Sequence, residues 1–336
     1  MMQQQDHPDA LPQRSLRDRV GICIEGTDPV DSLNKIRAAE LAGVQQIWMT
    51  AGGAGFTDIL TTLAVAAAQT EFIRVGTAII PFYPLHPLTL AQQALAVHDI
   101  APGRLRLGIG PSHRQIIEDR YGLQMTAPLP YLKEYLEVMR SVLWEEDPGY
   151  NGTFFKVGHA KVGNVVIPMS RKAPVPLLIS TLGPKAFRLA GEISDGALSW
   201  MCPLPYLLNQ GLPALRAGAE AHQRPAPPLV AHMLVAMSTD EAAVQAATRQ
   251  RVVQYTAGAF YARMFAQAGF PKVVEGDEAE SDALTRTLLV SGNEATVRNR
   301  IQELLESGLD ELMLQLVPIA DEANERKRFL QVVGSL

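Results

Sequence analysis

The first 140 residues repeat one pattern, in which a short apolar segment is followed by a loop and then by a segment with helical spacing. Alternation of this kind builds parallel βαβ units, because each helix returns the chain to the start of the next strand. The pattern therefore predicts an α/β fold. The strands are expected at 20–26, 45–50, 73–81 and 104–109, and the helices at 31–42, 57–69, 88–100 and 131–144.

The alternation breaks at residues 148–172, which are rich in Gly, Asn and short β-type pieces and are expected to form an excursion packed on the barrel. Residues 240–289 are expected to be helical, with an acidic patch around 275–282. Further strands are expected at 175–181, 196–199, 229–237 and 311–317. About eight strands without a separating linker predict a single (β/α)8 TIM barrel over 20–336, preceded by a flexible tail at 1–19.

The composition argues against nucleic-acid binding, membrane binding and a disulfide-stabilised fold. The chain has 336 residues, is 47% hydrophobic and has a formal net charge of -5, so it lacks the basic surface expected for binding nucleic acid or an anionic membrane. Cys23 and Cys202 are too few for a disulfide framework, and a reducing cytoplasm is the expected location. The N-terminus has no apolar signal segment. The helix expected at 57–69 could form a homodimer interface or pack on the core, and the sequence does not distinguish the two.

Residues 103–122 (GRLRLGIGPSHRQIIEDRYG) place polar side chains where a strand meets a helix. The strand stops at Gly110, Ser112 occupies an N-cap position, and Gln115 follows it as in a capping box. Ligands of α/β proteins bind at this end of the strands. His113 is therefore a candidate for proton exchange near neutral pH, the alternative being a solvent-facing histidine.

A second turn from a strand into a helix is expected at residues 181–184 (TLGP). It could bind a phosphate through the free N–H groups of the helix, or it could be a connection without a ligand. Neither this turn nor LGIGP matches a Rossmann or Walker pattern. Trp48 and Trp200 lie near strand ends, where an aromatic side chain walls a ligand or packs in the core. His86 is expected to shape a loop, and no pair of histidines has the spacing of a metal site.

Four segments, in this order, resemble the bacterial luciferase-like monooxygenase superfamily, in particular its branch of coenzyme F420-dependent oxidoreductases. They are IRVGTAIIPFYPLHPLTLAQQAL, GRLRLGIGPSHRQIIEDRYGL, YLKEYLEVMRSVL and VPLLISTLGPKAFRLAGEISDGALSWM. The resemblance extends through nearly all of residues 20–320. It implies a (β/α)8 barrel with an excursion after strand four, and a flavin or deazaflavin bound at the C-terminal mouth of the barrel.

The resemblance also implies individual roles. A non-proline cis peptide is expected at Ala78-Ile79, behind the central ring of the cofactor, and His113 falls where relatives place a proton-transferring side chain. Several dehydrogenases of this branch have a histidine after strand two, whereas this chain has AGG at 51–53, which argues against alcohol oxidation and predicts a wide floor of small residues. The implied cofactor-binding residues are Trp48, Thr50, Ala78, Ile79, Gly110, Pro111, Ser112, His113, Ser180, Thr181, Leu182, Gly183, Pro184 and Met201.

The function that follows from the resemblance is hydride transfer between coenzyme F420 and a small organic substrate, with His113 as proton donor or as orienter of the acceptor. The nearest alternative is an FMN-dependent monooxygenase that works with a separate reductase. A catalytically silent flavin-binding protein is disfavoured because residues 148–172 are present. A phosphate-binding isomerase barrel is disfavoured because no catalytic carboxylate or lysine stands out at a strand end.

Overall fold

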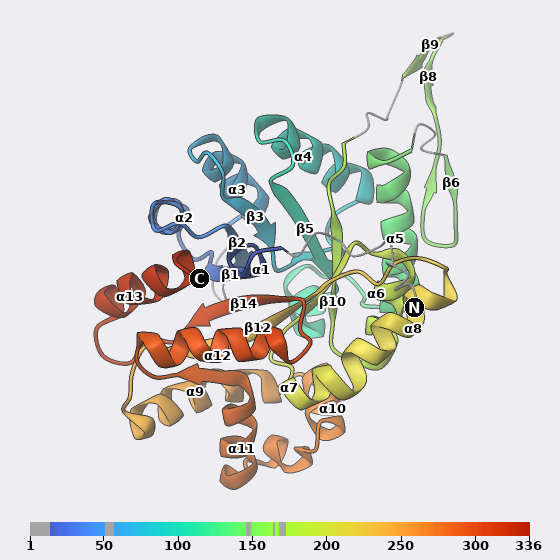
Figure 1. Ribbon diagram of the computed structural model, residues 1–336. Coiled ribbons are helices and arrows are strands. Elements are labelled where there is room, and N and C mark those ends of the chain that lie inside the picture. The colour runs from blue at the N-terminus through green and yellow to red at the C-terminus, as the bar shows by residue number, and fades with distance from the viewer. Residues whose placement is uncertain (1–13, 51–56, 146–148, 164, 168–172) are drawn as a thin grey trace, which may run out of the picture.

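Eight parallel strands close into a barrel in the computed structural model, which describes residues 14–50, 57–145, 149–163, 165–167 and 173–336 (Figure 1). Pairing of the first strand with the last, and of β5 with β10, closes the ring. The predicted TIM barrel is confirmed. Its strands are β1 (Val20–Glu25), β2 (Gln46–Thr50), β3 (Arg74–Thr77), β5 (Leu105–Gly110), β10 (Leu177–Thr181), β11 (Gly196–Ser199), β12 (Leu229–Ala236) and β14 (Glu311–Leu316).

Helices surround the barrel, and several begin at a polar side chain that caps their first turn. The side chains of Asp28, Asp58, Asp240 and Asn293 each accept a hydrogen bond from a first-turn N–H group. No helix in the described ranges is long and apolar enough to cross a membrane. The helices and helical turns are α1 (Leu16–Arg19), α2 (Pro29–Leu41), α3 (Ile59–Ala68), α4 (Pro87–Ile100), η1 (Ile116–Arg120), α5 (Pro128–Leu143), α6 (Pro184–Ile193), α7 (Leu204–Tyr206), η2 (Leu207–Gly211), α8 (Leu212–Ala221), α9 (Glu241–Thr256), α10 (Ala259–Gln267), η3 (Pro271–Glu275), α11 (Glu278–Leu288), α12 (Glu294–Glu306) and α13 (Glu322–Gly334).

The strand predicted at 73–81 is divided in two. β3 and the short β4 (Ile80–Pro81) both pair with β5, and the Ala78-Ile79 peptide between them is cis, as predicted. The Thr77 hydroxyl bridges to β5 just before the division: it donates to the Gly108 carbonyl and accepts from the Gly108 N–H, both at 2.8 Å. The division places the Ala78-Ile79 segment at the C-terminal mouth.

One strand was not predicted. β13 (Leu289–Ser291) pairs with the C-terminal part of β12, whereas β11 pairs with the N-terminal part of β12. Residues 240–289 were expected to be helical, and the structure corrects the end of this region, because Leu289 begins β13. A strand of three residues is too short to produce an alternating pattern, so its pairing with β12 determines its conformation.

The excursion lies between α5 and β10 and contains two hairpins. The first, β6 (Tyr150–Asn151) with β7 (Lys156–Val157), is held to α5 by the Glu134 carboxylate, which accepts hydrogen bonds from the N–H groups of residues 153–155. The second, β8 (Ala160–Val162) with β9 (Val165–Ile167), projects away from the barrel (Figure 1). The prediction of an excursion packed on the barrel is therefore right for the first hairpin only.

The described part of the expected tail, residues 14–19, is bound to the barrel. The Arg19 guanidinium donates to the backbone carbonyls of Leu309 and Asp310, at 2.6 Å and 2.8 Å, and that of Arg17 donates to the Gly43 carbonyl at 2.6 Å. Residues 16–19 form α1 and lead directly into β1. This part of the chain is therefore not a flexible tail.

The barrel interior is layered from one end to the other. The middle layer is an apolar plug, made of Cys23, Trp48, Leu178, Leu198, Val230 and Met313, all of them buried. Glycines make room for the indole of Trp48: a Cβ on Gly76 would lie 2.4 Å from it, and one on Gly21 would lie 3.0 Å away. Because the plug fills the barrel, a ligand entering from the C-terminal end comes to rest on it.

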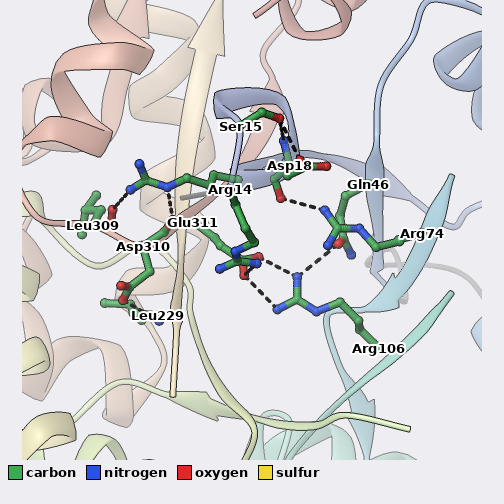
Figure 2. Close-up of polar contacts among 11 residues, drawn as sticks. Arg14, Ser15, Asp18, Gln46, Arg74, Arg106, Leu229, Leu309, Asp310 and Glu311 are labelled. Atoms are coloured by element: carbon green, nitrogen blue, oxygen red, sulfur yellow. Dashed lines mark hydrogen bonds and ion pairs between the residues drawn. The ribbon is translucent and has the colours of Figure 1, made fainter. Parts of the chain in front are cut away.

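The layer at the N-terminal end of the barrel is polar (Figure 2). Arg106 donates to both carboxylate oxygens of Glu311, at 2.6 Å and 3.2 Å, and Arg14 donates to the same carboxylate at 2.8 Å. Burial alone would raise the pKa of Glu311, but the charges and hydrogen bonds of Arg106 and Arg14 outweigh it and lower that pKa. This cluster fills the N-terminal end of the barrel, where residues serve stability and not catalysis.

We expect Glu311→Gln to lower the free energy of unfolding by about 3 kcal/mol, because it leaves the buried Arg106 guanidinium without a counter-charge. Since the folded-state pKa of Glu311 is lowered, the stabilisation is present above the unfolded-state pKa of about 4.3 and is lost as the pH falls. Urea denaturation at several pH values measures both effects. Glu303→Gln, which removes an exposed ion pair with Arg300, is the control and should cost less than about 1 kcal/mol. Equal losses for the two variants would contradict the prediction.

Candidate active site

The C-terminal mouth of the barrel has two different sides. One side, the small-residue arc, consists of Thr50, Ala78, Ile79, Gly110 and Ser180, at the ends of β2, β3, β5 and β10. All except Gly110 are half-buried, so they face the opening above the plug. The other side, the aromatic arc, consists of His113, Trp200, Tyr255 and Tyr261, and it is continuous through ring contacts.

The small-residue arc is tightly packed around Gly110. A Cβ on Gly110 would lie 2.3 Å from Ser180 Oγ and 3.1 Å from Ile79 Cγ1, so a larger residue here would displace these side chains. Ala78 and Ile79 pack on the apolar plug below. The arc is therefore a shallow, largely apolar platform, on which a flat ring system can lie.

The turn after β10 leaves a helix N-terminus open. Gly183 is the N-cap of α6, no side chain caps this helix, and a Cβ on Gly183 would meet nothing within 4 Å. Leu182, Gly183 and Pro184 are half-buried. First-turn N–H groups with a positive dipole end suit a phosphate. The Thr181 hydroxyl does not contribute as expected, because it is buried and donates to the Leu198 carbonyl at 3.2 Å.

His113 lies between the end of β5 and the turn that joins α9 to α10. Its ring stacks on Tyr261, with centroids 5.8 Å apart, and lies 6.3 Å from that of Tyr255. A cavity of about 170 Å³ opens beside it, lined also by Gly258 and Phe260. Burial lowers the pKa of His113 below its ordinary value, so the imidazole is neutral at pH 7. A neutral imidazole accepts a proton or orients a carbonyl more readily than it donates a proton.

Ser112 does not act as the predicted helix cap. Its backbone is left-handed, with φ 63°, and its side chain makes no hydrogen bond to any described residue. The helical segment begins one residue later, where the His113 carbonyl accepts a hydrogen bond from the Ile117 N–H at 3.1 Å. Pro111 and Ser112 are half-buried at the mouth, between the two arcs. They are therefore placed to contact a ligand.

Two of the implied cofactor residues belong to the core in this structure. Trp48 is 0% exposed, lies inside the barrel and has the Arg106 guanidinium 4.9 Å from its ring centroid. Met201 is 1% exposed. Their positions correct the expectation that they line the mouth. The expected small-residue floor at 51–53 lies outside the described residues.

His86 has a local structural role. It caps α4, because its Nδ1 accepts a hydrogen bond from the Leu88 N–H at 3.3 Å, and its ring meets Phe155 edge-on. It therefore shapes the loop as expected and does not belong to either arc of the mouth.

Sequence reasoning missed a buried polar chain at the mouth. His232 Nε2 lies 2.9 Å from Gln315 Oε1, Gln315 Nε2 donates to Glu25 at 2.7 Å, and Arg251 donates to the same Glu25 oxygen at 2.7 Å. His232 and Gln315 are 0% and 5% exposed. The available signal was a polar residue in the middle of an apolar stretch: His232 within LVAHMLVA and Gln315 within LMLQL.

The protonation of His232 follows from this chain. A carboxylate only accepts hydrogen bonds, so Gln315 must present its NH2 group to Glu25 and its carbonyl oxygen to His232. His232 therefore carries its proton on Nε2, and its buried Nδ1 has no partner among the described residues. Burial lowers the pKa of His232 to about 4, against which the Gln315 hydrogen bond acts weakly.

We expect His232 to stay neutral, as the Nε2–H tautomer, down to about pH 5, because its pKa is lowered to about 4. Two-dimensional ¹H–¹⁵N NMR of the imidazole nitrogens, recorded against pH, measures both tautomer and pKa. Since the folded-state pKa lies below the unfolded value of about 6.5, His232 should make the protein less stable as the pH falls from 6.5 towards 4. A titration midpoint near 6.5 would contradict this.

Comparison with known proteins assigns the family. A Mycobacterium tuberculosis protein provisionally named a coenzyme F420-dependent oxidoreductase is 29% identical over 273 residues, which cover 74% of this chain and 76% of that protein. An F420-dependent secondary alcohol dehydrogenase, solved with an F420-acetone adduct, has a TM-score of 0.75 at 19% identity, covering 94% of this chain and 97% of its own. The oxygenating constituent of 3,6-diketocamphane monooxygenase from Pseudomonas putida, solved with FMN, has a TM-score of 0.69 at 16% identity, covering 94% and 96%. At these identities the two solved structures show the fold alone. The luciferase-like monooxygenase family matches residues 23–311, and the chain belongs to that family.

Proposed function

We propose that this protein is a coenzyme F420-dependent oxidoreductase that transfers hydride to or from a small organic substrate at the C-terminal mouth of the barrel. One observation carries the proposal: a shallow platform of small residues lies over an apolar plug, beside an open helix N-terminus. A flat ring with a phosphate-bearing chain matches these two surfaces. The relative that shares 29% identity over three-quarters of this chain bears the name of an F420-dependent oxidoreductase.

The residues present fit such a cofactor. The small-residue arc would hold the flat ring, and the first turn of α6 would hold the phosphate through backbone N–H groups, without repulsion from a capping carboxylate. When bound, the deazaflavin supplies or accepts the hydride at its central ring. The protein orients the two partners, excludes water and moves protons.

His113 is the residue proposed to exchange the proton. It stands at the junction of the small-residue arc and the aromatic arc, half-buried, with a cavity beside it. Because burial favours its neutral form, it can take up the N–H proton as an amine is oxidised, or orient a carbonyl while that group is reduced. The rings of Tyr255 and Tyr261 lie beside it, with centroids 6.3 Å and 5.8 Å from that of His113.

The second candidate is an FMN-dependent monooxygenase, and the FMN-bound relative of the same fold favours it. FMN also has a flat ring and a phosphate, so the mouth alone accepts both cofactors. The reactions differ, because a deazaflavin lacks the nitrogen at which ordinary flavins take part in oxygen chemistry. Cofactor identity therefore decides the reaction class.

Side-by-side binding of F420 and FMN to the purified protein, followed by fluorescence, tests the proposal. We expect F420 to bind at least tenfold more tightly than FMN. A preference for FMN would replace the proposal by the monooxygenase function. Binding of neither cofactor would refute both.

A further inference from the structure

Glu25 is the last residue of β1, and the barrel brings its side chain to the aromatic side of the mouth, where it contacts Gln315 and Arg251. Its side chain is 38% exposed, whereas its partner Gln315 is 5% exposed. Gln315 and Arg251 both donate to one oxygen, Oε1, at 2.7 Å. The second oxygen, Oε2, takes no hydrogen bond from a described residue.

The polar chain behind Glu25 fixes the direction of its carboxylate. His232 holds Gln315 in one amide orientation, and Gln315 in turn holds Glu25 Oε1. Trp200 stacks on His232 with ring centroids 3.8 Å apart and separates it from the opening. A buried chain in which each donor has one acceptor is more rigid than a surface ion pair.

The charges at this side of the mouth balance. Arg251 compensates the negative charge of Glu25, and His232 is neutral because it is fully buried and its Nδ1 has no partner among the described residues that would stabilise a second proton. A charged substrate group therefore gains little from the site. A neutral O–H or N–H group gains a hydrogen bond to a charged oxygen, which is stronger than one between neutral groups.

We infer that Glu25 is the substrate-recognition residue of this mouth, and that its free oxygen accepts a hydrogen bond from a neutral O–H or N–H donor on the substrate. His232 and Gln315 are positioning residues that act through Glu25. The apolar part of such a substrate would lie against Tyr255 and Trp200, whose ring centroids are 6.5 Å apart. The inference rests on the proposed function for the identity of the mouth as the active site.

Binding of two matched probes tests the inference. Cyclohexanol carries an O–H donor, and cyclohexyl methyl ether has the same ring and oxygen without the donor. Ligand-observed NMR, run on the protein with and without F420, should give cyclohexanol roughly tenfold tighter binding than the ether, the difference expected for one hydrogen bond to a charged acceptor. Glu25→Gln should remove this preference.

Two further pairs of variants distinguish a loss of substrate recognition by Glu25 from a general loss of structure at the mouth. His232→Leu should weaken the preference for cyclohexanol several-fold, while His232→Gln, which keeps a donor near the position of Nε2, should restore it. Arg251→Gln should shift the preference towards cyclohexylammonium, because the charge of Glu25 is no longer balanced. Arg249→Gln on the same helix, whose side chain pairs with Asp282 instead, should change nothing.

Equal binding of the two probes, binding of neither, or a preference that survives Glu25→Gln would overturn the inference. A failure of the proposed function gives a different result. In that case F420 does not bind, but the protein without cofactor still prefers cyclohexanol through Glu25.

Discussion

Gly183→Asp should weaken F420 binding on the order of a hundredfold while leaving the fold intact or slightly more stable. Gly183 is the N-cap of α6, and a side chain there meets no atom within 4 Å. Aspartate is among the best N-cap residues, so its carboxylate would bind the same N–H groups that a phosphate needs. It would also repel the phosphate by its charge. Fluorescence titration measures the affinity, and thermal unfolding measures the stability.

Two neutral substitutions at Gly183 divide this effect into its parts. Gly183→Ser also caps the helix but carries no charge, so it should reduce F420 affinity less, by about tenfold or under. Gly183→Ala adds a methyl group in open space and should leave the affinity within about threefold of that of the unsubstituted protein. If Gly183→Asp binds F420 as tightly as Gly183→Ala does, the phosphate does not lie at α6.

The barrel was predictable because its strands are buried on both sides. Such strands appear in the sequence as short apolar runs between amphipathic helices, and the strand predicted at 196–199 has the observed bounds of β11. The division of strand three and the short β13 had no signal in the pattern of apolar residues. The first depends on Thr77 bridging to Gly108, and the second on pairing with β12. Both are contacts between distant strands.

The candidate site was predictable only in part, for the same reason. His113 follows the end of β5 at Gly110 by three residues, and Pro111 stops that strand, so its place at the mouth follows from local sequence. Glu25 and Gln315 are 290 positions apart and meet only because β1 pairs with β14 in the closed barrel. For Trp48 the local sequence was misleading. Its place near the end of β2 suggested that it lines the mouth, but side chains alternate in direction along a strand, and that of Trp48 points into the barrel and belongs to the apolar plug.

His113→Ala should reduce turnover by about 10²- to 10⁴-fold, the range lost when a positioned acid or base is removed. F420 affinity should stay within about twofold, because the ring of His113 lies against Tyr261 and Tyr255 in the aromatic arc, whereas the ring and phosphate of the cofactor are assigned to the small-residue arc and to the first turn of α6. His98→Ala, on the outer helix α4, is the matched control and should keep full activity. Loss of F420 binding together with turnover in His113→Ala would mean that the residue is structural.

The pH dependence of the same variant shows which way His113 moves the proton. Burial lowers the pKa of His113 below about 6.5, so the protonated form exists only in more acidic solution. If His113 donates the proton during reduction, kcat/KM for reduction should rise as the pH falls towards that pKa. If it accepts the proton during oxidation, kcat/KM for oxidation should fall over the same interval. His113→Ala should abolish this limb of the profile, because His113 is the only histidine among the described residues of the two arcs. His232 lies behind Trp200, and its pKa of about 4 places its titration in more acidic solution. A limb that persists unchanged in the variant would assign the proton to a group other than His113.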